Sequence, residues 1–83
     1  MTKTCSSSRL DAVTSISFNM SRSKCAEAIK QGEIQVNWEA TSSPSAATKP
    51  GDVIAWRGKG RCELIEMHVN HRDRTVVEFS LKS

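Results

Sequence analysis

The chain has few aromatic residues, no long apolar run and no paired pattern of cysteines. Among its 83 residues are two Trp, two Phe and no Tyr. These are not interleaved as a stacking platform would be, so stacking along a single nucleic-acid strand is not the first expectation. No stretch approaches the roughly 20 apolar residues of a membrane-spanning helix, and we expect no membrane partner.

The three cysteines, Cys5, Cys25 and Cys62, are odd in number and scattered along the chain. A disulfide framework needs pairs, and the common zinc sites need a close Cys-x-x-Cys spacing, which is absent here. We therefore expect free thiols in a reducing compartment, which favours a cytoplasmic protein. No cofactor is expected.

The sequence contains no recognisable catalytic arrangement. His68 and His71 stand three apart on a segment that runs from a strand into a turn, where they would not share a face, so no metal site is expected. Neither a Ser-His-Asp nor a Cys-His arrangement can be assembled from the motifs. The prediction is a protein that is not an enzyme.

The N-terminal segment and the rest of the chain differ in composition. Residues 1–8 are polar and rich in serine, without the apolar stretch of a secretory signal. We expect them to form a flexible tail. Residues 9–83 are then predicted to form a single domain, near the size at which one core is only modestly stabilising.

Two short helices are predicted first. Apolar residues at helical spacing, among them Leu10 and Val13, indicate a helix over residues 9–16. A second helix is expected over residues 22–31, since Ser21 is a suitable N-cap and Gly32 can adopt the left-handed conformation that ends a helix.

Four segments with alternating apolar residues follow and predict strands, at residues 34–38, 53–57, 62–69 and 75–81. The fold class is therefore α+β, with two packed helices followed by a small, mainly antiparallel sheet in the order ααββββ. The side chains expected in the core are Leu10, Val13, Ile29, Ile34, Val36, Val53 and Ile65.

The basic residues are grouped rather than spread evenly. The formal charge of +3 permits an anionic partner, and residues 57–61 contain three cations separated by glycines. A helix that begins after Ser21 presents unpaired N–H groups that suit phosphate, and arginine adds paired donors for phosphate oxygens. Residues 21–24 and 57–61 are expected side by side on one surface, with Arg72 and Arg74 away from it. Charge alone favours ordinary solvated side chains.

A set of short motifs, taken in their order along the chain, instead favours an RNA-binding role for these basic residues. It comprises Arg-Leu-Asp at residues 9–11, Ser21-Arg22, residues 29–32, Val36-Asn37 and residues 49–52. Together they resemble the S4-type RNA-binding domain, in particular the C-terminal domain of the YlmH-like and photosystem II S4-domain protein group. The resemblance covers residues 9–61 and continues weakly to the end of the chain. The candidate RNA-binding residues are Arg9, Ser21, Arg22, Lys24, Lys30, Asn37, Arg57, Lys59 and Arg61.

The resemblance implies a monomeric RNA-binding module that grips structured RNA, ribosomal or transfer RNA, by its backbone and shape, with the ribosome as a partner. Two other interpretations remain open. One is a protein-interaction domain with an exposed anchor at Trp38 or Trp56. The other is the RNA-guiding domain of a larger RNA-modifying protein whose catalytic part lies elsewhere.

Overall fold

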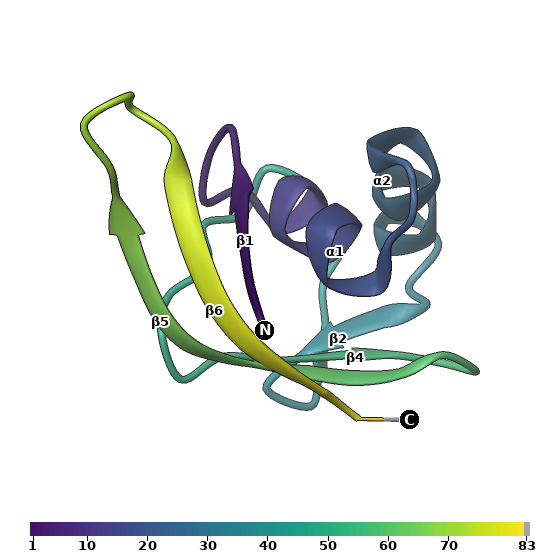
Figure 1. Cartoon of the computed structure of the whole chain (residues 1–83). Helices are drawn as coiled ribbons and strands as arrows, with labels where there is room; N and C mark the ends of the chain where they lie inside the picture. Colours follow the sequence, from purple (N-terminus) through teal and green to yellow (C-terminus); the bar gives the residue numbers. More distant parts are fainter. Residues whose placement is uncertain (83) are drawn as a thin grey trace.

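Two short helices cover the concave face of one curved antiparallel sheet (Figure 1). The computed structural model describes residues 1–82, whose elements are β1 (Thr2–Cys5), α1 (Leu10–Phe18), α2 (Arg22–Lys30), β2 (Ile34–Val36), β3 (Glu39–Ala40), β4 (Val53–Trp56), β5 (Gly60–Val69) and β6 (Thr75–Lys82). The strand order is β1-β6-β5-β4-β2-β3. The predicted class, two packed helices followed by an antiparallel sheet, is confirmed, and β1 and β3 extend the sheet at its edges.

Both helices begin and end as their local sequence dictates. The Ser21 side chain accepts a hydrogen bond from the Lys24 backbone N–H at 3.2 Å, so the predicted N-cap of α2 is confirmed. Gly32 follows the end of this helix with φ +78°, as predicted. The first helix runs two residues beyond the predicted end, to Phe18, and stops at Asn19 in the left-handed conformation (φ 56°).

The N-terminal segment is part of the sheet. Residues 2–5 pair with β6, and Cys5 is buried with 5% of its surface exposed. The Met1 carbonyl also accepts a hydrogen bond from the Phe79 backbone N–H at 2.8 Å. The prediction of a flexible tail over residues 1–8 is therefore wrong for residues 2–5. This strand is held by backbone pairing. Because only one of its side chains is apolar and turned inward, its sequence shows almost no alternation of apolar and polar residues.

The core lies between the two helices and the inner face of the sheet. Four of the predicted core residues, Leu10, Val13, Ile29 and Ile34, are fully buried, and Val36 is partly buried against them. Val53 is not a core residue, contrary to prediction: it alternates with the buried Ile54 and Trp56 and so lies on the other face of β4, where it is only partly buried. The residues that complete this core are Cys5, Ala12, Cys25, Ala28, Ile54, Trp56, Cys62, Leu64, Val77 and Phe79.

Ile65 is not a core residue, contrary to prediction. Its side chain is 43% exposed, while Cys62 and Leu64 on the same strand face the helices. The pairing of β5 with β6 shifts between Leu64 and Glu66, which marks a β-bulge. A bulge inserts one extra residue and so breaks the strict alternation from which the inward face was predicted.

All three cysteines are free and buried. Burial, reinforced by the negative charge of Asp11, raises the pKa of the Cys25 thiol from 9.0 to about 11. Burial also raises the pKa of Cys5 and of Cys62. These thiols stay protonated near neutral pH and are not nucleophiles.

Alkaline pH is expected to destabilise the fold through Cys25. Between about pH 9 and pH 11 the unfolded thiol ionises while the folded one keeps its proton, so the unfolded state is favoured as pH rises. The contribution of Cys25 to the free energy of unfolding should fall by about 1.4 kcal/mol per pH unit in this window. Denaturant unfolding from pH 8 to 11 measures it against Cys25→Ala, whose curve should be flatter. Parallel curves for the two proteins would contradict the prediction.

Candidate nucleic-acid interface

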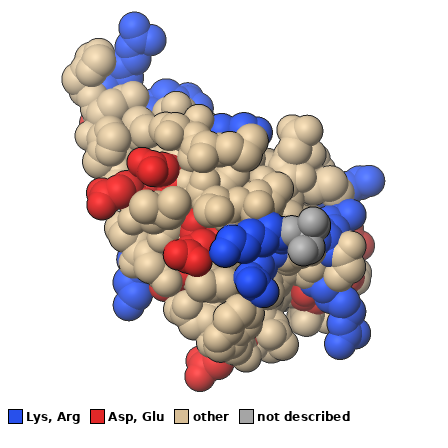
Figure 2. Space-filling model, turned by 60° about the horizontal axis from the view of Figure 1, so that its bottom comes forward, with Lys and Arg blue, Asp and Glu red and all other residues tan. Residues whose placement is uncertain are grey.

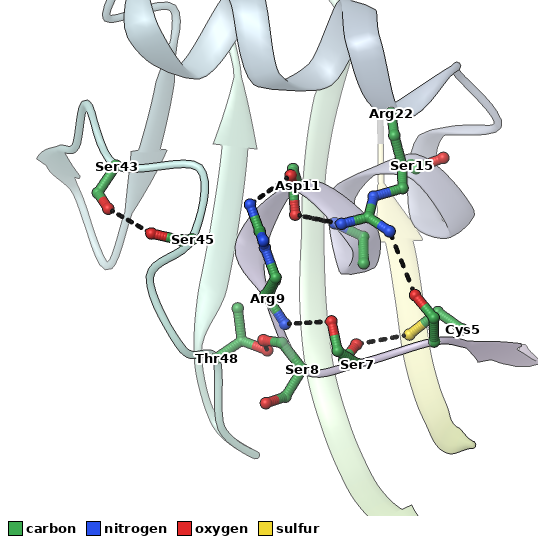
Figure 3. A network of polar contacts seen from close by, with 12 residues as sticks. Cys5, Ser7, Ser8, Arg9, Asp11, Ser15, Arg22, Ser43, Ser45 and Thr48 are labelled. Carbon is green, nitrogen blue, oxygen red and sulfur yellow. Dashed lines mark hydrogen bonds and ion pairs between the residues drawn. The ribbon is translucent and has the colours of Figure 1, made fainter. Parts of the chain in front are cut away.

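Two arginines are held by one buried carboxylate where the two helices begin (Figure 3). Asp11, in the first turn of α1, accepts a hydrogen bond from Arg9 Nη2 at 3.2 Å and from Arg22 Nη2 at 3.3 Å. It also accepts from the Ala12 backbone N–H at 2.8 Å. Asp11 is only 5% exposed, so the carboxylate fixes both guanidinium groups from beneath. We refer to Arg9 and Arg22 as the arginine pair.

The arginine pair remains available to a ligand. The two side chains are 48% and 46% exposed. Arg22 uses a second nitrogen, Nη1, to donate to Ser6 Oγ at 3.2 Å. A guanidinium has five N–H donors in a planar fork, so each arginine keeps donors for a further acceptor. Two oriented forks with spare donors suit an anion with several oxygens, and phosphate is the common biological case.

The backbone around Arg9 is also fixed. Its N–H donates to Ser7 Oγ at 3.3 Å, and the residue forms an isolated antiparallel bridge with Ala47. The next N–H, of Leu10, donates to the Ala46 carbonyl at 2.8 Å. The loop that precedes β4 therefore buttresses the start of α1, and the arginine pair belongs to a structured corner of the molecule.

A second basic group lies around Trp56. The Lys59 ammonium stands 5.5 Å from the centre of the Trp56 ring, a cation–π geometry. Lys24, on α2, shares a shallow cleft with the same tryptophan. Arg22 and Lys24 are two residues apart, which is about 200° around an α-helix, so they face opposite ways. The predicted contiguous surface of residues 21–24 and 57–61 is thus divided: Arg22 lies on the Asp11 side, whereas Lys24 and Lys59 each lie near Trp56.

Arg61 faces away from the helices. Because side chains alternate along a strand and Cys62 is buried, Arg61 projects from the outer face of the sheet. Its partner across the β5–β6 pair is Lys82, and its partner across the β4–β5 pair is Ala55. Figure 2 shows this face, on which a group of basic side chains lies near the centre with acidic side chains directly beside it.

The other predicted site residues have local roles or stand apart. Ser21 caps α2. The Asn37 side chain donates to Asp52 Oδ1 at 3.0 Å and accepts from the Val53 N–H at 3.1 Å, so it braces two loops. Lys30 lies at the far end of α2 from the arginine pair. Arg57 is exposed and lines a small depression with Gly32, Glu33, Gln35, Ala55 and Trp56.

Sequence reasoning missed two features of the arginine side of the molecule. Asp11 was credited with a helix-dipole role, whereas it also orients both arginines. Arg74 was expected on a distant hairpin, yet its charge and that of Arg22 both act on the Cys5 thiol, partly offsetting the burial that raises its pKa. The pairing of β1 with β6 sets Cys5 opposite Thr75, next to Arg74, and β1 itself was not predicted.

Within residues 1–82, no group of three or more His, Cys, Asp or Glu side chains could hold a metal ion. In the same part of the chain, no helix is long and apolar enough to cross a membrane. Trp56, one of the two proposed protein anchors, is 5% exposed and packs edge-on against Phe18, so that proposal is wrong for Trp56.

Oriented arginines at two helix starts of a small α+β domain are a chemistry suited to nucleic-acid phosphates. Residues 8–54 match the S4 domain family, and the chain belongs to this family, whose domains bind RNA. The matched residues include the arginine pair and Asp11 and end before residues 57–61.

Two similar proteins extend the comparison. The chain is 41% identical over 77 residues to the ribosome-associated protein quality control protein P2 of Bacillus subtilis (strain 168). The aligned region covers 92% of this chain and 30% of that protein. It is also similar to the crystal structure of a pseudouridylate synthase, with a TM-score of 0.56 and 30% identity over 60% of this chain and 22% of that one. This chain thus spans under a third of either relative.

Proposed function

We propose that this chain is a non-enzymatic RNA-binding module that grips structured RNA through the arginine pair. The observation that carries this proposal is the geometry at Asp11. One buried carboxylate holds two half-exposed guanidinium groups within the residues that match the S4 domain. Because both guanidinium groups are already held in place, less side-chain entropy is lost when they contact a phosphate.

The proposed ligand is RNA with helical structure. Duplex RNA is recognised mainly by its shape, its phosphates and its 2′-hydroxyls, for which paired arginine donors are suited. Lys24 and Lys59 provide a second point of contact beside Trp56. Arg61, on the outer face, would act through its long-range field rather than by contact.

Ribosomal or transfer RNA is the proposed class, in a cytoplasmic protein that acts as a monomer. The Bacillus subtilis relative is named as ribosome-associated, which supports ribosomal RNA and the ribosome as partner. The likeness to a pseudouridylate synthase favours a second candidate function, the RNA-guiding domain of a larger RNA-modifying protein. Both functions use the same RNA-contacting surface and differ in what else the full protein carries.

A salt series on the intact chain tests RNA binding. The probe is a labelled RNA hairpin with a fully paired stem, and the control is a DNA hairpin of the same sequence. If the arginine pair, Lys24 and Lys59 contact four phosphates, the logarithm of affinity should fall with the logarithm of salt with a slope of about −3. The DNA hairpin, with B-form geometry, should bind more weakly. Salt-independent binding, or equal affinity for both hairpins, would contradict the proposal.

A further inference from the structure

Trp38 occupies an unusual position at the tip of the hairpin that joins β2 to β3. Its φ is 68° and that of Asn37 is 53°, both in the left-handed region. Bulky residues rarely adopt this conformation, and the strain persists only where the surroundings impose it. The side chain is nevertheless 63% exposed, so core packing is not what the strain supports. The two-residue turn between Val36 and Glu39 itself requires a positive φ at both central positions, so what needs a reason is a large, exposed aromatic side chain where glycine is usual.

The turn that carries Trp38 is held firmly. The Asn37 backbone N–H donates to the Val53 carbonyl at 2.8 Å, and its side chain is bonded to Asp52 and to Val53. Val36 and Glu39 pair directly on either side of the turn. The indole therefore projects from a fixed base, and a planar ligand could stack on it with little loss of backbone freedom.

The same turn flanks a cleft whose far wall is formed by residues next to Arg9. This cleft, of about 350 Å³, is lined on one side by Val36, Asn37 and Glu39, and on the other by Leu10 and Ala47. Leu10 directly follows Arg9, and Ala47 is bridged to Arg9. The cleft thus lies between the Trp38 turn and the start of α1, where Arg9 stands, so an extended ligand that contacts Arg9 could reach the indole.

Trp38 is not the centre of an apolar surface. Among residues 1–82 the other exposed large apolar side chains lie on β5 and β6 or at the N-terminus, across β4 and β2 from this hairpin: Met1, Ile65, Val69 and Leu81. Protein interfaces place their anchors in a desolvated apolar core, which is missing here. A single exposed aromatic with no other large exposed apolar side chain on its hairpin better suits one planar base.

We propose that Trp38 stacks on an unpaired nucleobase of the RNA whose phosphates lie on Arg9 and Arg22. This inference rests on the proposed RNA binding and deepens it. The preferred ligand becomes a helix interrupted by a bulge or a loop, with one base turned out beside the phosphates. Because stacking involves no counterion release, it adds affinity without changing the salt slope.

The test compares three RNA duplexes of one sequence: fully paired, with a single-nucleotide bulge, and with an abasic site in the bulge. The parent should bind the bulged duplex about tenfold or more tighter than the other two. Trp38→Gly, which relieves the positive φ and so should fold, is expected to lose this preference while its salt slope stays unchanged. Trp38→Phe should keep most of it, and Val69→Ala, a remote exposed apolar residue, should keep all of it.

Three outcomes would overturn the inference. If Trp38→Gly keeps the preference for the bulged duplex, Trp38 does not stack on the base, while RNA binding itself stands. If it weakens binding to all three duplexes equally, the side chain acts on the fold or on the backbone contact. If the parent binds no duplex in a salt-dependent manner, RNA binding and stacking fail together, and the exposed indole becomes the protein anchor.

Discussion

Deleting residues 1–6 is expected to lower the free energy of unfolding by about 3–5 kcal/mol, through lost burial and lost backbone pairing. The deletion removes the buried Cys5 side chain and four residue pairs between β1 and β6. It also leaves β6 as an unpaired edge strand, which is prone to associate with other chains. Most small domains have only about 5–15 kcal/mol of stability, so much of the fold's margin would be lost.

Denaturant unfolding measures the loss, and Cys5→Ala separates the side chain from the strand. This substitution keeps the backbone pairing and should cost only about 1–2 kcal/mol. A difference of less than about 0.5 kcal/mol between the deletion and the parent would mean that the segment is the flexible tail suggested by its composition. Size-exclusion chromatography of the truncated chain shows whether the exposed β6 edge causes association.

The parts of the fold that were predictable from sequence are those with strong local signals. Ser21 and Gly32 mark the ends of α2 by capping chemistry that acts within a few residues. β1 could not be foreseen in this way, since its paired residues on β6 lie 70 or more positions away in sequence and its pairing uses the backbone. The bulge at Ile65 likewise depends on the register with β6, which no local pattern fixes.

In the candidate site, too, features set by local sequence could be predicted and features set by tertiary packing could not. The residue types and spacing pointed to Arg9 and Arg22 as candidates but not to their common carboxylate, because Asp11 meets Arg22 only when the two helices pack. The separation of Arg22 from Lys24 follows from helix geometry alone and could have been derived. So could the outward direction of Arg61, from its alternation with an apolar Cys62. Placing Arg74 required β1, which the sequence does not reveal.

Replacing both members of the arginine pair should have the largest effect on RNA binding. Each arginine is positioned to make charge-assisted hydrogen bonds, worth about 1.5–3 kcal/mol apiece, so Arg9→Ala/Arg22→Ala should weaken binding to the RNA hairpin about 100-fold or more. The salt slope should flatten by nearly two, because each lost phosphate contact removes about 0.7–0.9. Preference between RNA sequences should be unchanged, since phosphate contacts carry no base information.

The matched control removes the same net charge from the other face of the sheet. Arg61 and Lys82 pair across β5 and β6, away from the helices, so Arg61→Ala/Lys82→Ala changes the long-range field without removing a proposed contact. It should weaken binding by less than about fivefold, in keeping with screening over about 10 Å at moderate salt. Circular dichroism confirms that both variants fold. Equal losses in the two variants would show that RNA is attracted by net charge alone, and that the geometry around Asp11 does not define the site.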